Sequence, residues 1–146
     1  TFVEFDAPLP GDYDGDGTDQ AACFRPSNIM RPSISLWAVR GITRFYYGAG
    51  GDLPVPGVYR WYGGYSRGFG PFQRQAAIFR PASGLWALRG STRIYFGQTA
   101  DQAVPADYDG SGIDDIGIFR EDSGLWAVRG VSRFYYGASG DLPVTR

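Results

Sequence analysis

Two short segments of the chain carry oxygen-bearing side chains at a spacing that suits a metal ion. Residues 12–20 read DYDGDGTDQ, and residues 107–115 read DYDGSGIDD. Oxygen side chains stand at positions 1, 3, 5 and 9 of each segment, and glycines stand where the chain must turn sharply. A hard cation such as calcium takes about six to eight oxygen ligands, from carboxylates and backbone carbonyls. We therefore expect one calcium ion in each segment, with the seventh residue offering its carbonyl, and the ligands are Asp12, Asp14, Asp16, Thr18 and Gln20, and Asp107, Asp109, Ser111, Ile113 and Asp115.

The charge of these segments favours the metal interpretation. Eight of the 15 acidic residues of the chain lie within the two segments. Like charges this close repel one another unless a cation neutralises them. A pair of Asp/Gly turns that bind no metal is the alternative, but the same spacing occurs twice at the same place in a repeat. The matching stretch 58–66 carries Arg60 and aromatic residues in place of the acids, so we expect no ion there.

The elements that must position these segments are short strands in a threefold repeat. The runs SLWAVRGITRFYYG, GLWALRGSTRIYFG and GLWAVRGVSRFYYG occupy residues 35–48, 84–97 and 124–137. Aromatic and β-branched runs bounded by glycine predict strands, and a unit of about 40 residues is the size of a propeller blade. We therefore predict one all-β domain of three tandem, blade-like repeats. An overlapping N-terminal strand precedes them, and the ranges are 1–10 for that strand and 11–56, 57–105 and 106–146 for the repeats.

The acidic loop followed by a strand ending in FRP resembles the FG-GAP/VCBS-type repeats of integrin-α-like β-propellers and bacterial surface proteins. The resemblance covers nearly the whole chain. It implies calcium bound in blade loops, a secreted or cell-surface setting, and a role in adhesion, carbohydrate binding or structure. Gln20, Ser111 and the missing acidic site in the middle repeat depart from the pattern of the family.

Aromatic and arginine side chains recur in register with the repeat. We expect the aromatic residues to form the core between neighbouring blades, with a row of sugar-stacking platforms as the alternative. This set comprises Trp37, Trp86, Trp126, Phe24, Phe79, Phe119, Tyr46, Tyr95 and Tyr135. Nine arginines are expected to bond and stack between blades, with an anion-binding surface as the alternative. They are Arg25, Arg80, Arg120, Arg40, Arg89, Arg129, Arg44, Arg93 and Arg133.

The middle repeat contains an insertion, at 59–74, that the repeat does not explain. Aromatic residues and arginines alternate there with glycine, and Trp, Tyr and Arg dominate the energetics of protein interfaces. One interpretation is a contact surface made by Tyr59, Trp61, Tyr62, Tyr65, Arg67, Phe69 and Phe72. The other is a segment that folds back over the core.

Composition argues against several functions. The chain has no His and no Lys, and it has one thiol, Cys23, so the usual nucleophile–base pairs cannot be assembled. A net charge of −1 does not suit nucleic acid, and no apolar run is long enough for a membrane span. Residue 1 is Thr, so we expect a processed chain or a fragment. The acids outside the loops mark out no catalytic pair, and they are Glu4, Asp6, Asp52, Asp101, Glu121, Asp122 and Asp141.

These observations predict an extracellular, non-enzymatic, calcium-stabilised structural protein. Each repeat can bury its apolar face only against a neighbour, so open faces at the two ends of an array favour contact between copies. We expect a homopolymer such as a filament, with a dimeric ring and then a closed monomer as alternatives. A lectin-like carbohydrate-binding or adhesion module is the competing function.

Overall fold

The regular secondary structure of the described residues consists of short β-strands. The structure, a computed structural model, describes residues 6–27, 34–60 and 73–144. Within those ranges there are twelve strands, and no helix is long and apolar enough to cross a membrane. This confirms the predicted all-β class.

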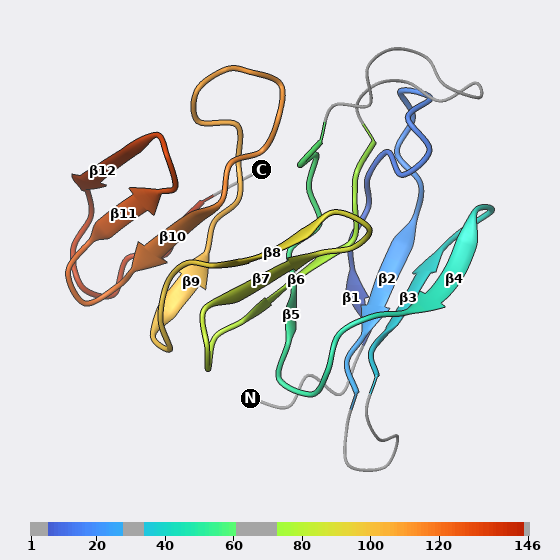
Figure 1. The fold of residues 1–146 in the computed structure, drawn as a ribbon, viewed down its shortest axis with the longest axis horizontal. Coiled ribbons are helices and arrows are strands. Elements are labelled where there is room, and N and C mark those ends of the chain that lie inside the picture. The colour runs from blue at the N-terminus through green and yellow to red at the C-terminus, as the bar shows by residue number, and fades with distance from the viewer. Residues whose placement is uncertain (1–5, 28–33, 61–72, 145–146) are drawn as a thin grey trace.

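The strands form three separate sheets, each of four antiparallel strands in sequence order. We call these sheets blades one, two and three (Figure 1). Blade one contains β1 (Ala7–Pro8), β2 (Ala22–Arg25), β3 (Leu36–Val39) and β4 (Thr43–Tyr46). Blade two contains β5 (Leu53–Pro54), β6 (Ala77–Arg80), β7 (Leu85–Leu88) and β8 (Thr92–Tyr95). Blade three contains β9 (Asp101–Ala103), β10 (Gly117–Arg120), β11 (Leu125–Val128) and β12 (Ser132–Tyr135).

The blades begin slightly earlier than the predicted repeats. The first strands of blades two and three, β5 and β9, lie in the last residues of the predicted repeats 11–56 and 57–105. The N-terminal strand β1 pairs with β2, so it is the regular first strand of blade one. In every blade the acidic loop, or its counterpart in blade two, joins the first strand to the second.

The same register recurs in each blade because the same residues recur. Phe24 stands opposite Trp37, and the matching Phe–Trp pairs of the other blades have the same register. The indole N–H of Trp37 donates to the carbonyl of Tyr47, 3.0 Å away, and the other two tryptophans make equivalent bonds. The turn after the third strand needs a positive φ, 78° at Gly41, which glycine adopts at little cost.

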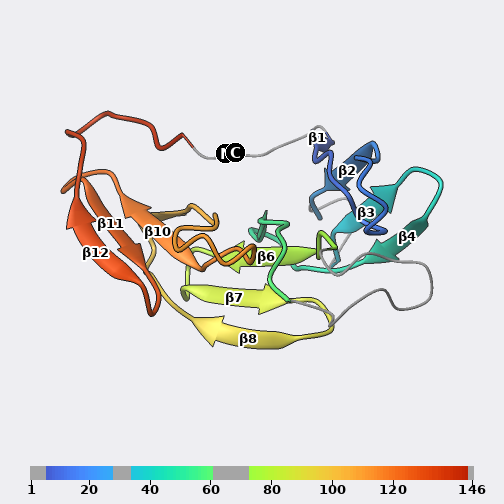
Figure 2. The same cartoon turned by 90° about the horizontal axis from the view of Figure 1, so that it is seen from above.

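The blades stand side by side in an arc, and their apolar faces meet in two seams (Figure 2). One core cluster joins blades one and two, and it includes Phe24, Trp37 and Ile78. A second cluster joins blades two and three, and it includes Phe79, Trp86 and Ile118. Trp37 and Trp86 have no exposed surface. The expected core role is therefore confirmed in these seams for Trp37, Trp86, Phe24 and Phe79. Phe119 is buried outside both clusters, and Trp126 is only partly buried.

The repeated tyrosines are not in the core, and that prediction is wrong. Tyr46, Tyr95 and Tyr135 are 66%, 71% and 71% exposed. Side chains alternate between the two faces of a strand. In blade one Phe45 therefore packs inward beside Tyr47, whereas Tyr46 points away from the seam.

Candidate metal centres

The first acidic loop brings three carboxylates together. Oxygens of Asp12, Asp14 and Asp16 all lie within 4.8 Å of one another. The carboxylate of Asp12 accepts backbone N–H groups of Gly15 at 2.6 Å and Gly17 at 2.8 Å, which curls the loop around it. Both glycines have positive φ, and this allows the tight turn.

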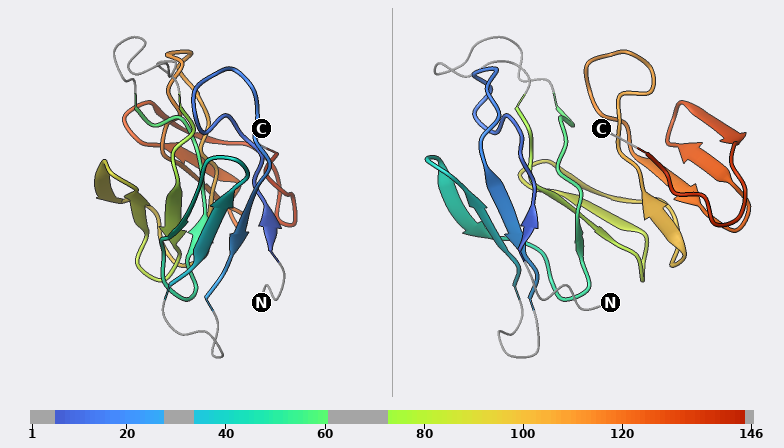
Figure 3. Two further views of the ribbon diagram at one scale, coloured as in Figure 1. Left: turned by 90° about the vertical axis from the view of Figure 1, so that its right-hand side faces the viewer. Right: turned by 180° about the vertical axis from the view of Figure 1, so that it is seen from behind.

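The loop of blade three is built in the same way. Asp107, Asp109 and Asp115 offer oxygens within 4.8 Å of one another. Asp107 accepts the backbone N–H groups of Ser111 at 2.9 Å and Gly112 at 2.8 Å, as Asp12 does in blade one. The two loops lie at the same end of their blades (Figure 3). The sequence thus correctly located two Asp triads that can hold a metal ion.

The ninth residue of the loop differs between the two sites. In blade three, one oxygen of Asp115 accepts the backbone N–H of Tyr108 at 2.9 Å, and its carboxylate still belongs to the triad. In blade one, the amide oxygen of Gln20 accepts the equivalent N–H of Tyr13 at 2.7 Å. Its amide nitrogen then donates to Asp14 at 3.1 Å and to the carbonyl of Thr18 at 2.7 Å. In this orientation Gln20 offers a hydrogen-bond donor where a cation needs an oxygen.

The fifth residue of the loop compensates for the difference at the ninth, because it is the acid in blade one and not in blade three. Asp16 completes the triad of blade one, whereas the hydroxyl of Ser111 lies 3.5 Å from the carbonyl of Ile113 in blade three. Each site therefore has three carboxylates, contributed from positions 1, 3 and 5 in one blade and from positions 1, 3 and 9 in the other.

The electrostatics of the blade-three loop suit a cation. Burial raises the pKa of the Asp115 carboxyl, and the charges of Asp109 and Asp107 raise it further against a hydrogen bond from Tyr108. Hydrogen bonds from Ser111 lower the pKa of Asp109. A carboxylate held near two others in this way would be stabilised by a positive ion between them.

The loop of blade two contributes to the seam instead. The backbone N–H of Val58 donates to the carboxylate of Asp114 in blade three, 2.8 Å away. The hydroxyl of Tyr59 donates to the carbonyl of Val55 at 2.6 Å, and its ring packs against the core cluster of blades two and three. The other six predicted contact residues, Trp61, Tyr62, Tyr65, Arg67, Phe69 and Phe72, lie outside the described residues.

Tyr59 has counterparts in the other two blades. The hydroxyls of Tyr13 and Tyr108 donate to the carbonyls of Leu9 and Val104 with the same four-residue separation. This repeated bond fixes the lead into each loop. The structure therefore accounts for Tyr59 by packing within the repeat.

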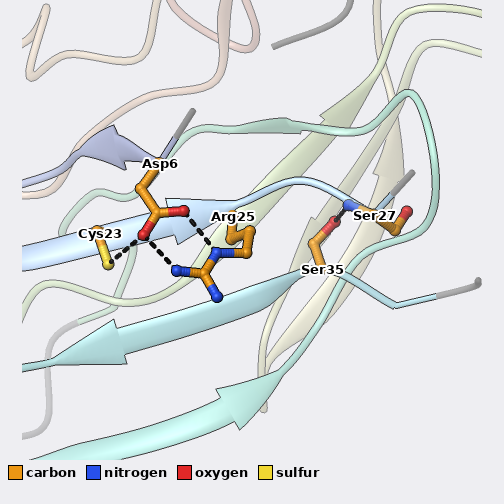
Figure 4. A network of polar contacts seen from close by, with 5 residues as sticks. All are labelled: Asp6, Cys23, Arg25, Ser27 and Ser35. Carbon is orange, nitrogen blue, oxygen red and sulfur yellow. Dashed lines mark hydrogen bonds and ion pairs between the residues drawn. The ribbon is translucent and has the colours of Figure 1, made fainter. Parts of the chain in front are cut away.

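A second repeated pair was missed by the sequence analysis. An Asp just before the first strand of a blade, or in blade three at its first residue, binds the Arg that ends the second strand. The guanidinium Nε lies 2.6 Å from Asp6 in Arg25, 2.7 Å from Asp52 in Arg80 and 2.8 Å from Asp101 in Arg120. Figure 4 shows the blade-one pair, with Cys23 beside it. These arginines were expected to bond between blades, and they instead bond within one blade.

Comparison with models of known protein families, with curated proteins and with solved structures finds no match to this chain. The structure supports a tandem array of four-stranded sheets with two acidic clusters. The FG-GAP/VCBS resemblance rests on the sequence motifs alone.

Proposed function

We propose that this chain is a calcium-stabilised structural repeat protein of the FG-GAP/VCBS type that acts outside the cell and assembles with copies of itself. The observation that carries the proposal is the pair of Asp triads at the same position of blades one and three. Three clustered carboxylates with nearby backbone carbonyls provide the hard oxygen ligands that calcium prefers.

A structural role for the ion follows from the position of the loops. Each acidic loop joins the first and second strands of its blade, and its backbone also contacts blade two. The N–H of Arg74 donates to the carbonyl of Asp12 at 2.7 Å, and the N–H of Asp114 donates to the carbonyl of Val58 at 2.6 Å. An ion that holds a loop in this conformation would stabilise both the blade and the seam.

A non-enzymatic role is part of the proposal. Asp52 and Asp101 hold arginines within their blades, and six further acids belong to the two triads. The chain has neither His nor Lys to act as a general base. These assignments give most of the carboxylates a structural role.

Calcium titration tests the proposal. We expect two ions per chain and a rise in the thermal unfolding temperature, since an ion present at a hundred times its dissociation constant stabilises the fold by about 2.7 kcal/mol per site. Asp109→Asn should remove one ion, whereas Asp122→Asn, at an exposed acid outside the loops, should keep both. A folded protein whose unfolding temperature does not respond to millimolar calcium would contradict the proposal.

Carbohydrate binding is the second candidate, and the exposed tyrosines favour it. Tyr46, Tyr95 and Tyr135 stand at the same position on the fourth strand of three adjacent blades. A row of exposed aromatic rings can stack on sugars. A lectin would be a monomer with saturable affinity for a glycan, whereas a structural protein would form large particles without added ligand.

A further inference from the structure

The seam between neighbouring blades is built twice from the same parts. In the first seam, Phe45 and Tyr47 of blade one pack against the cluster that contains Ile78 of blade two. In the second seam, Ile94 and Phe96 of blade two pack against the cluster that contains Ile118 of blade three. One blade therefore supplies two large side chains from its fourth strand and the residues beyond it, and the next blade supplies an apolar face to receive them.

Three further contacts identify this seam. The guanidinium carbon of Arg89 in blade two lies 3.9 Å from the centre of the Phe45 ring in blade one. A Cβ placed on Gly48 would lie 3.1 Å from Ile78, and one placed on Gly97 would lie 3.0 Å from Ile118.

The third contact is a backbone hydrogen bond between loops. It runs from Arg74 N–H to the Asp12 carbonyl at 2.7 Å in the first seam. In the second seam it runs from Asp114 N–H to the Val58 carbonyl at 2.6 Å. Both seams contain the glycine contact and the backbone bond at equivalent positions, and the first seam adds the Arg89–Phe45 contact, so a third seam of the same kind can be specified residue by residue.

Blade three presents the supplying surface of such a seam in exposed form. Phe134 is 41% exposed and Tyr136 is 76% exposed, whereas their counterparts in blades one and two are partly buried. Trp126 is partly exposed, although Trp37 and Trp86 are completely buried. A Cβ placed on Gly137 would meet only Asp141, with no apolar side chain in the position of Ile78 or Ile118.

Blade one presents the receiving surface. A groove of about 710 Å³ is lined by Ala21, Cys23, Ala38 and Arg40, among other residues. The equivalent groove of blade three is lined on one side by Phe96, which blade two supplies. Within blade two, the counterparts of Ala21, Cys23 and Ala38 are buried by blade one. The groove of blade one is therefore the receiving surface of a seam, and within the described residues no preceding blade supplies the aromatic side chains that would fill it.

We propose that blade three of one copy docks on blade one of a second copy through this same seam, with Asp6 and β1 of the second copy in the place that Asp141 and the residues after it take in the single chain. The proposal rests on the proposed self-assembly and specifies its surface. Arg40 of the second copy stacks on Phe134, and Cys23 of the second copy lies against Gly137. The backbone N–H of Asp19 in the second copy donates to the carbonyl of Asp107. The occupant is a second copy because each surface is the complement that the other lacks.

The experiment measures particle size against protein concentration, by sedimentation of the intact chain in calcium. The variants are Tyr136→Ala and Arg40→Ala, which remove one group from each side of the junction, and both residues are exposed, so neither change disturbs the core. Tyr95→Ala is the matched control, because Tyr95 is as exposed as Tyr136 but lies outside both surfaces. We expect Tyr136→Ala and Arg40→Ala to weaken association about tenfold or more, and Tyr95→Ala to leave it unchanged.

Cys23 gives a second measurement on the unmodified protein, since it is the single thiol of the chain. Alkylation of Cys23 should slow as copies assemble, and Tyr136→Ala should restore the rate of the dilute protein. If both substitutions leave assembly unchanged and Cys23 stays reactive in the assembled protein, the proposed junction is wrong, but the proposal of self-assembly stands. A monomer at every concentration would overturn both, while calcium binding would stand. If Cys23 resists alkylation in that monomer, the chain covers its own blade-one groove, and the junction between copies is also wrong.

Discussion

The repeated Asp–Arg pair gives a stability series within one molecule. An Asp recurs at the equivalent position of the repeat four times along the chain, and its surroundings differ between the copies. Asp52 and Asp101 have fully buried side chains and bind Arg80 and Arg120. Asp6 binds Arg25 but its side chain is 35% exposed. Asp141 accepts the backbone N–H of Ala138 at 2.8 Å. Replacing each Asp by Asn tests how burial changes the value of one interaction.

The magnitude at Asp52 follows from its contacts. One oxygen accepts Arg80 Nε at 2.7 Å, and the other accepts Arg80 Nη2 at 3.0 Å and the N–H of Ala49 at 2.8 Å. In Asp52→Asn an amide N–H must face at least one of these donors, and the charge that neutralises Arg80 is lost. Breaking a buried pair costs about 3–5 kcal/mol. The Arg80 side chain is 39% exposed and can turn to water, so we expect about 2–3 kcal/mol.

The other three positions calibrate this value. Asp101→Asn should cost about the same as Asp52→Asn, since its carboxylate makes the same three kinds of bond. Asp6→Asn should cost about 0.5–1 kcal/mol, the value of an exposed ion pair. Asp141→Asn should change stability by less than about 0.5 kcal/mol.

Urea unfolding in constant calcium, followed by tryptophan fluorescence, measures the series, because Trp37 and Trp86 lose their complete burial on unfolding. An equal loss of unfolding free energy in Asp6→Asn and Asp52→Asn would refute the argument from burial. A loss at Asp141 as large as that at Asp52 would show that capping of the turn, and not the Arg, sets the effect.

Two further predictions concern the loop and the core. Gln20→Asp should strengthen calcium binding at the blade-one loop by about tenfold, because it replaces an amide donor with an oxygen ligand and adds one charge, and calorimetry of the variant against the native chain measures this. No gain in affinity would place the ninth residue outside the coordination sphere. Trp86→Ala should destabilise the chain by about 3–5 kcal/mol, whereas Trp126→Ala should cost clearly less at concentrations where the chain is a monomer, as guanidinium unfolding can show. An equal cost at both tryptophans would mean that blade three is as well packed as blade two.

The repeat made most of the fold predictable. Matching runs, LWAV or LWAL and RFYY or RIYF, indicated the third and fourth strands in each blade, and a unit of about 40 residues indicated a blade-like sheet. The alternation of side chains along a strand also predicts, within RFYY, that the first tyrosine points away from the seam. Because Phe45 and Tyr47 face the seam, Tyr46 between them faces solvent. Recurrence of tyrosine at one position of the repeat favoured the core, but alternation along the strand decides which face a side chain takes, so the core assignment was wrong.

The Asp–Arg pairs were harder to predict because their partners are distant in the chain. Asp52 and Arg80 are separated by 28 residues, and the acids outside the loops appeared unpaired. The available signal was the recurrence of an Asp just before or at the start of each first strand, at a constant place in the repeat relative to the recurring FR. The triads were predictable because their spacing is local. The orientation of Gln20 was not, since it depends on the bond that its oxygen makes with Tyr13.

The loop of blade two has no acids, and this sets where acidic loops meet along an assembled array. Within one chain, each seam joins an acidic loop to the acid-free loop of blade two, where Val58 and Arg74 make the contacts. In the proposed junction, the loop with Asp107 meets the loop with Asp19, so two acidic loops touch only where two copies meet. Calcium would neutralise both sides of that boundary, and its removal would concentrate like charge there rather than inside either copy. An array of such chains would therefore come apart between copies before it loosens within them.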